Sequence, residues 1–249
     1  HLVPKHFARV VHACYNAARA HSLAQMSAFV RHGPPFVQEL ALGSVQLYGA
    51  LRSAPLIGAR AGPPEVLASL SAGLAHFCTG YMRSWGRDTF IALRGLLLVT
   101  GRHDDARELI LGYAQCVRHG LVPNLLDSGR HPRFNSRDAA WFWLKAVLDY
   151  AESAPRGTAL LHEMVLRRYG DPASTADATD VSAWASVTDI VQDVLTQHAR
   201  GIHFRERNAG RAIDDRMQDA GFNVDIDRDP ATGFVHGGNA LNCGTWMDK

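Results

Sequence analysis

The stretch WGRDTFIALRG, residues 85–95, begins with an aromatic residue, a glycine and an Arg-Asp pair and continues as an apolar helical segment. A second stretch, NSRDAAWFWL at residues 135–144, repeats this order. In both, the Asp falls near the first turn of the expected helix, where a carboxylate interacts favourably with unpaired N–H groups and the helix dipole. We therefore expect two helices with related roles, headed by Arg87-Asp88 and Arg137-Asp138.

Hydrophobic residues recur at helical spacing through much of the chain. The spacing predicts helices over residues 5–32, 65–76, 88–100, 104–120, 137–152 and 184–200, and leaves residues 36–51 open between helix and strand. Ser136 is the expected N-cap of the helix at 137–152. In the helix at 104–120 the residues expected to face the core are Ala106, Leu109, Ile110, Tyr113 and Val117.

The pattern changes near the end of the sequence. Residues 223–227 and 233–236 alternate like two short strands, joined by a turn at 229–232. Elsewhere, short connections alternate with long ones rich in polar and aromatic residues. This alternation suits a toroid of helix pairs whose inner helices start at one shared edge, with the long loops forming a pocket there. We expect an all-α fold with a small β-hairpin insertion.

Composition and motifs exclude several classes of function. A net charge of +2 gives no basic surface for nucleic acid or an anionic membrane. No apolar run is long enough to span a bilayer, and no secretory signal is recognisable, so we expect a cytoplasmic protein. Neither HExxH nor GxGxxG, GxxxxGK[ST] or GxSxG occurs, so we predict neither a metal nor a cofactor. The four cysteines have no CxxC spacing and are expected to be buried, reduced thiols.

An acidic run at residues 225–229 begins like a calcium-binding loop. However, the sixth position is Pro230 rather than glycine, and the twelfth is His236 rather than glutamate. We therefore interpret the run as a turn with solvated acids. Residues 204–208, FRERN, are interpreted as a salt-bridged segment.

Tryptophans accompany the Arg-Asp pairs, and two interpretations are open. In the simpler one, each Asp caps its helix and pairs with the neighbouring Arg. In the other, the pairs bind a sugar, because carboxylates and guanidinium groups exchange hydrogen bonds with hydroxyls and flat aromatic rings cover the apolar face of a sugar. A third stretch, GTWMD at 244–248, is either another first-turn Asp or a partly desolvated general acid.

Five long motifs together resemble the eukaryotic glycogen debranching enzymes, in their C-terminal amylo-α-1,6-glucosidase region. They are WGRDTFIALRG (85–95), HGLVPNL (119–125), NSRDA (135–139), FRERNAG (204–210) and NCGTWMDK (242–249), and the likeness extends over nearly the whole chain. The resemblance implies a glucoamylase-type (α/α)6 toroid, present here only in part. Residues 1–64 would form a helical lead-in, and residues 65–249 the first part of the glucosidase domain. Both ends look cut, so we expect a piece of a longer protein.

The resemblance also implies an activity. It is hydrolysis, with inversion, of the single α-1,6-linked glucose at a branch stub of glycogen or limit dextrin. Asp248 would be the general acid, Arg87 and Asp88 would hold the terminal glucose, and the general base would lie in a later segment. We expect the sugar site to include Trp85, Arg87, Asp88, Arg137, Asp138, Trp141, Asn239 and Trp246.

Two alternatives remain open. One is a non-catalytic glucan-binding module or isoform built on the same half-toroid. The other is a different (α/α)6 glycosidase, such as a glucoamylase or trehalase relative, although the stretches at 204–210 and 242–249 favour a debranching enzyme. Without a general base of its own, the 249-residue chain is expected to be inactive.

Overall fold

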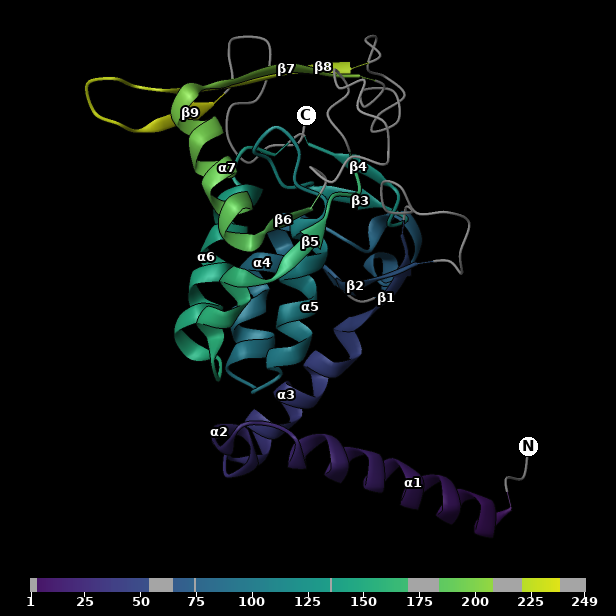
Figure 1. The fold of residues 1–249 in the computed structure, drawn as a ribbon. Coiled ribbons are helices and arrows are strands. Elements are labelled where there is room, and N and C mark those ends of the chain that lie inside the picture. Colours follow the sequence, from purple (N-terminus) through teal and green to yellow (C-terminus); the bar gives the residue numbers. More distant parts are fainter. Residues whose placement is uncertain are drawn as a thin grey trace.

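The computed structural model describes residues 4–53, 65–73, 75–134, 136–169, 184–207 and 221–237. Helices dominate, and they enclose a core at the centre of the molecule (Figure 1). The α-helices are α1 (Lys5–Ala24), α2 (Ala28–Arg31), α3 (Pro35–Leu47), α4 (Gly86–Leu93), α5 (His103–Ala114), α6 (Ala139–Ser153) and α7 (Val187–Arg200). None of the helices in this described part is both long and apolar enough to cross a bilayer.

Shorter helical turns link these elements. They are the 3-10 turns η1 (Ala75–Phe77), η2 (Gly80–Met82) and η4 (Gly157–His162), and a π-helical turn η3 (Arg94–Leu98) that continues α4. The helix predicted from residue 88 to about residue 100 is thus confirmed, and it ends at Gly101, whose φ is +82°.

Four small antiparallel sheets accompany the helices, so the all-α expectation was too narrow. The pairs are β1 (Tyr48–Arg52) with β2 (Val66–Leu70), β3 (Leu125–Asp127) with β4 (His131–Arg133), and β5 (Met164–Leu166) with β6 (Trp184–Ser186). A three-stranded sheet has the order β7 (Ile202–Arg207), β8 (Gly221–Arg228), β9 (Val235–Gly237). The predicted hairpin is confirmed as β8 and β9, and the FRERN segment contributes to β7.

Three helix predictions were wrong in detail. Residues 66–70 form strand β2, because they pair in register with β1 from Tyr48 to Arg52. The helix expected over 5–32 breaks after Ala24; Ser27 donates its backbone N–H to the carbonyl of Thr100, and its side chain caps α2. Trp184, expected on the last helix, lies in strand β6, which ends at Ser186, directly before that helix begins at Val187.

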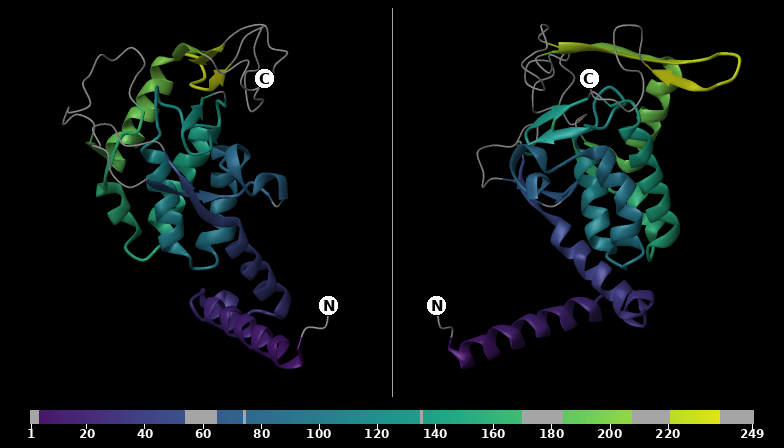
Figure 2. Two further views of the ribbon diagram at one scale, coloured as in Figure 1. Left: turned by 90° about the vertical axis from the view of Figure 1, so that its right-hand side faces the viewer. Right: turned by 180° about the vertical axis from the view of Figure 1, so that it is seen from behind.

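The main core lies between α4, α5, α6 and α7. All five residues predicted to face inward from the 104–120 segment are fully buried. Trp143 of α6 is also fully buried, and its Nε1–H donates to the carbonyl of Ile110 at 3.2 Å. In both Figure 1 and the views of Figure 2, α4, α5 and α6 stand side by side, with α7 beside α6 and the β7–β8–β9 sheet across one end. Helices α4 and α6 start at this same end.

Candidate functional site

The first turns of α4 and α6 lie next to each other at the end of the helices that faces the β7–β8–β9 sheet. We call residues 85–88 and 136–141 the rim. Across it, Arg87 Nε donates to Asp138 Oδ1 at 2.8 Å, and Arg87 Nη2 donates to Ser136 Oγ at 2.8 Å. The Ser136 hydroxyl donates in turn to Asp138 Oδ1 at 2.6 Å. The two Arg-Asp motifs are therefore joined crosswise, the Arg of the first to the Asp of the second.

This crosswise pairing leaves Asp88 available. Its side chain is exposed in the first turn of α4, and it makes no hydrogen bond or ion pair among the described residues. The simpler interpretation, in which each Arg pairs with its own neighbouring Asp, does not hold for Arg87. An exposed carboxyl group at this position can accept hydrogen bonds from ligand hydroxyls.

Ser136 has a different role from the one expected. The structure starts α6 at Ala139, with Asp138 at the N-cap position and no side-chain capping bond. The buried Ser136 hydroxyl instead bridges Arg87 and Asp138. A contact between residues 49 positions apart leaves no signal in local sequence spacing.

The turn before α4 is fixed by a close backbone approach. Gly86 N–H donates to the carbonyl of Asn124 at 2.8 Å, and a Cβ on Gly86 would lie only 2.2 Å from the carbonyl oxygen of Pro123. Only glycine fits there. Half-buried Trp85 donates its Nε1–H to the carbonyl of Met82 at 2.7 Å and presents its ring edge-on to Phe77. The hydrogen bond from Gly86 to Asn124 therefore joins the WGRD motif (85–88) to the HGLVPNL motif (119–125).

Trp141 lies in the first turn of α6 with 37% of its surface exposed. Its ring meets the ring of His198 from α7 edge to face, with centroids 4.8 Å apart. His198 is buried, and its Nδ1–H donates to the carbonyl of Val194 at 2.8 Å. Burial lowers the pKa of His198 below its usual value, so the ring is neutral at neutral pH. Sequence reasoning missed His198, because nothing in the spacing of α7 points to Trp141.

Arg137, the second rim arginine, is turned toward the sheet. It is 6% exposed, and its Nη2 donates to the carbonyl of Asn223 in β8 at 3.4 Å. The loop before residue 121 also contacts the sheet, where the ring centroids of His119 and of Phe204 in β7 lie 4.4 Å apart. Segments far apart in sequence therefore meet around the rim: 119–125, 136–141, and the two strands β7 and β8.

The acidic run on β8 and its turn has a structural role. Asp229 accepts hydrogen bonds from Ala231 N–H and the Thr232 hydroxyl, which confirms the interpretation of the segment as a turn. Asp225 and Asp227 flank the ring of His203 in β7, at 3.3 and 3.2 Å from its two nitrogens. Within the described ranges, no three His, Cys, Asp or Glu side chains are placed to hold a metal ion.

The predicted residues Asn239, Trp246 and Asp248 lie outside the described residues, as does Cys243. Their roles stay predictions. Of the other cysteines, Cys116 is buried, Cys78 is half-buried and Cys14 is exposed, so the expectation of buried thiols was wrong for Cys14. All three are free thiols. Cys14 is exposed because it lies on a helix that extends away from the core (Figure 2).

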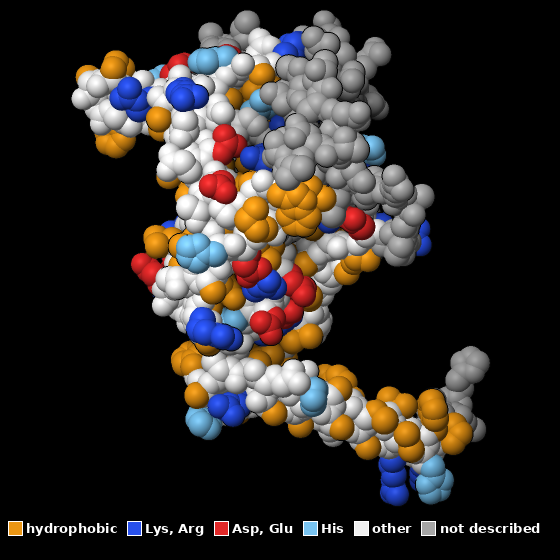
Figure 3. All heavy atoms as spheres, viewed as in Figure 1, with side chains coloured by type: hydrophobic (Ala, Val, Ile, Leu, Met, Phe, Trp, Pro, Cys, Tyr) orange, Lys and Arg blue, Asp and Glu red, His pale blue; other side chains and the backbone are white. Residues whose placement is uncertain are grey.

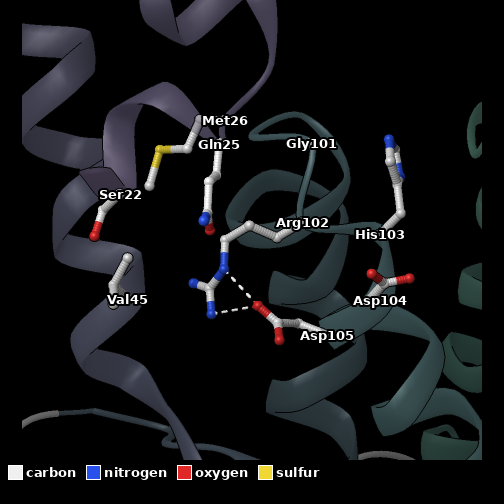
Figure 4. A pocket seen from close by; sticks show the side chains of 9 residues that line it. All are labelled: Ser22, Gln25, Met26, Val45, Gly101, Arg102, His103, Asp104 and Asp105. Carbon is white, nitrogen blue, oxygen red and sulfur yellow. Dashed lines mark hydrogen bonds and ion pairs between the residues drawn. The ribbon is translucent and has the colours of Figure 1, made fainter. Parts of the chain in front are cut away.

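A cavity of about 410 Å³ lies at the other end of the helices, between α1, α3 and the start of α5. Figure 4 shows Arg102 and Asp105 turned toward each other inside it, where Arg102 Nε donates to Asp105 Oδ2 at 2.6 Å. The thirteen residues of α4 and η3, about 20 Å of helix, start at the rim and lead toward this cavity. The residues that line it come from α1, α3 and the start of α5, and they lie far from the Arg-Asp motifs.

Comparison with known proteins identifies a family that this chain matches. A family model described as amylo-alpha-1,6-glucosidase matches residues 44–249. The glycogen debranching enzyme of Saccharomyces cerevisiae is 45% identical over 252 aligned residues. That alignment covers 100% of this chain but 16% of the yeast protein, so the chain spans about a sixth of the relative's length.

Proposed function

The chain belongs to the amylo-alpha-1,6-glucosidase family, and from this membership we propose that its rim forms one side of a glucose-binding site. The reaction at this site is hydrolysis of α-1,6-linked glucose at the branch stubs of glycogen or limit dextrin. The observation that carries the proposal is the Arg87–Asp138 contact, which holds the first turns of α4 and α6 together while the Asp88 side chain stays exposed in the first turn of α4.

Each rim residue has a role that its contacts support. Asp88 accepts hydrogen bonds from hydroxyls of the terminal glucose. Arg87 and Ser136 orient Asp138, which still has acceptor capacity on its second carboxylate oxygen. The exposed part of Trp141 offers an aromatic face to the apolar side of the sugar ring. Arg137, bonded to β8, positions the rim against the sheet.

The chemistry itself requires two carboxyl groups. Inverting glycosidases place a general acid and a general base on opposite sides of the scissile bond, about 6.5–9.5 Å apart so that a water molecule fits between them. We assign the acid to Asp248, next to Trp246, where partial desolvation favours the protonated form. The base comes from part of the relatives' length that residues 1–249 do not span. Asn239 completes the sugar contacts of this site.

The test compares two first-turn aspartates in the full-length enzyme. Asp88 begins α4 at the rim, whereas Asp104 begins α5 at the opposite end; both are exposed. Losing a charged hydrogen bond to glucose costs about 1.5–3 kcal/mol, so we expect Asp88→Asn to lower kcat/KM for limit dextrin by about 10- to 100-fold. Asp104→Asn removes the same helix-dipole interaction and should leave kcat/KM unchanged. Equal activity of the two variants would refute the proposed site.

Glucan binding without glucose release by the full-length wild-type protein would instead support the non-catalytic alternative. Both quantities can be measured on one preparation, as glucose released from limit dextrin and as retention on immobilised glycogen.

A further inference from the structure

Helix α6 carries two tryptophans near its start, and they are held in different ways. Trp143 is fully buried, and its indole Nε1–H donates to the carbonyl of Ile110 at 3.2 Å. Trp141 is 37% exposed, and its indole makes no hydrogen bond among the described residues. The backbone N–H of Trp141 donates to the carbonyl of Asp138 at 3.0 Å. The main chain of Trp141 is therefore tied to the rim, while its indole depends on ring contacts for its orientation.

Exposure alone does not give Trp141 a role, because hydrophobic side chains are also exposed along much of α1 (Figure 3). Phe7 and Tyr15 on that helix are 61% and 58% exposed. Trp141 differs from them in its position at the rim and in its contact with a buried ring, that of His198 in the last turn of α7. Helix α6 begins at the end of the molecule where α7 finishes, so this contact lies beside the rim (Figure 1).

The ring of His198 is held firmly. It is 1% exposed, and its Nδ1–H donates at 2.8 Å to the carbonyl of Val194, one turn earlier in the same helix. This bond leaves Nε2 as an acceptor, and Nε2 is buried with no hydrogen-bond partner among the described residues. A buried acceptor without a partner costs stability, so an apolar side chain would suit the packing here better. Stability therefore does not account for an imidazole at this position.

The contact between the two rings does account for it. The rings of His198 and Trp141 are 4.8 Å apart between centroids and inclined at 62°, which is an edge-to-face arrangement with a preferred geometry. We propose that His198 is a positioning residue of the sugar site, whose buried ring fixes the angle at which Trp141 presents the exposed part of its indole to the terminal glucose. Without this support the sugar would have to order the indole on binding, which lowers affinity. The role rests on the proposed function, because His198 acts only through the stacking of Trp141 on the sugar.

The test is a double-mutant cycle on KM for limit dextrin, measured in the full-length enzyme. Losing an edge-to-face aromatic contact corresponds to about a two- to tenfold change in binding, so His198→Leu should raise KM by that factor and leave kcat nearly unchanged. Trp141→Leu should raise KM at least as much. Because His198 acts through Trp141, adding His198→Leu to Trp141→Leu should raise KM no further. A full second increase in the double variant, or a wild-type KM in His198→Leu, overturns the proposal.

Two further variants separate positioning from a general effect on folding. His198→Phe keeps a flat ring against Trp141 and should bring KM back toward the wild-type value; a KM equal to that of His198→Leu overturns the proposal. Ile190→Val, buried two turns earlier in α7, should lower the urea midpoint and leave KM unchanged. A raised KM in Ile190→Val would mean that KM follows stability, which also overturns the proposal.

Failure of the proposed function gives a different result. If Trp141→Leu leaves KM at the wild-type value, Trp141 does not bind the sugar and the site itself is wrong. If Trp141→Leu raises KM and His198→Leu does not, the sugar site stands and only the role of His198 is refuted.

Discussion

Arg87 and Asp138 meet at 2.8 Å across the first turns of α4 and α6, although they lie 51 positions apart in sequence. Their side chains are 16% and 30% exposed, so the pair is only partly screened by solvent. Each residue belongs to a different Arg-Asp motif, and in the described part of the structure neither pairs with the Arg or Asp next to it in sequence. The rim is therefore defined by tertiary contact between two local motifs.

A double-mutant cycle measures this coupling. We expect Arg87→Ala and Asp138→Ala to be non-additive in the free energy of unfolding by about 1–2 kcal/mol, because each single change leaves the other partner without its charged hydrogen bond. The comparison pair is Arg19 of α1 and Glu39 of α3, whose side chains are 31% and 55% exposed and whose coupling should be about 0.2–1 kcal/mol. Equal coupling energies for the two pairs would show that the rim contact has no special strength.

Gly86 tests the close approach that fixes the turn before α4. Its missing Cβ would lie 2.2 Å from a backbone oxygen, so Gly86→Ala should destabilise the protein by about 2 kcal/mol or more. Gly43 in α3 is the matched control, since apart from its chain neighbours and the backbone of its own helix no atom lies within 4 Å of the position of its Cβ. There, alanine should be neutral or stabilise by up to about 1 kcal/mol. Urea unfolding measures the stability of both variants. A Gly86→Ala variant as stable as the wild type would contradict the close approach of Gly86 to Pro123.

The helices of the core were predictable because their signal is local. Ala106, Leu109, Ile110 and Tyr113 share one helix face whatever the rest of the chain does, and all are buried. Strand β2 was not predictable, since its state depends on pairing with β1, a segment that itself follows directly on a helix.

The same distinction, between local patterns and contacts distant in sequence, applies to the candidate site. The Arg-Asp motifs and their positions at helix starts could be recognised from sequence. That Arg87 reaches Asp138 through Ser136, and that His198 lies under Trp141, are consequences of packing between helices distant in sequence. Neither contact has a periodicity that a sequence pattern could show.

His198 makes stability depend on pH. Burial lowers its pKa in the folded protein, so the unfolded chain binds a proton at higher pH than the folded chain does. Its contribution is complete above the unfolded value of about 6.5 and is lost as pH falls through the lower folded value. We expect the urea midpoint to be lower at pH 5.5 than at pH 7.5, and His198→Leu to reduce that difference. The comparison variant is His12→Leu, on the exposed helix α1. A pH difference of the same size in His198→Leu would assign the effect to other groups.

Asp248→Asn in the full-length enzyme tests the proposed general acid. An amide cannot deliver a proton to the leaving oxygen, so kcat for glucose release should fall by about 10²- to 10⁴-fold. Retention on glycogen should change little, because the amide keeps the shape and much of the hydrogen bonding of the carboxyl group. Asp88→Asn should differ by weakening binding as well, which raises KM. A substrate whose leaving group needs no protonation, such as a glucosyl fluoride, should restore much of the rate in Asp248→Asn but not in Asp88→Asn. Turnover of limit dextrin by Asp248→Asn at the wild-type rate would move the acid to another residue.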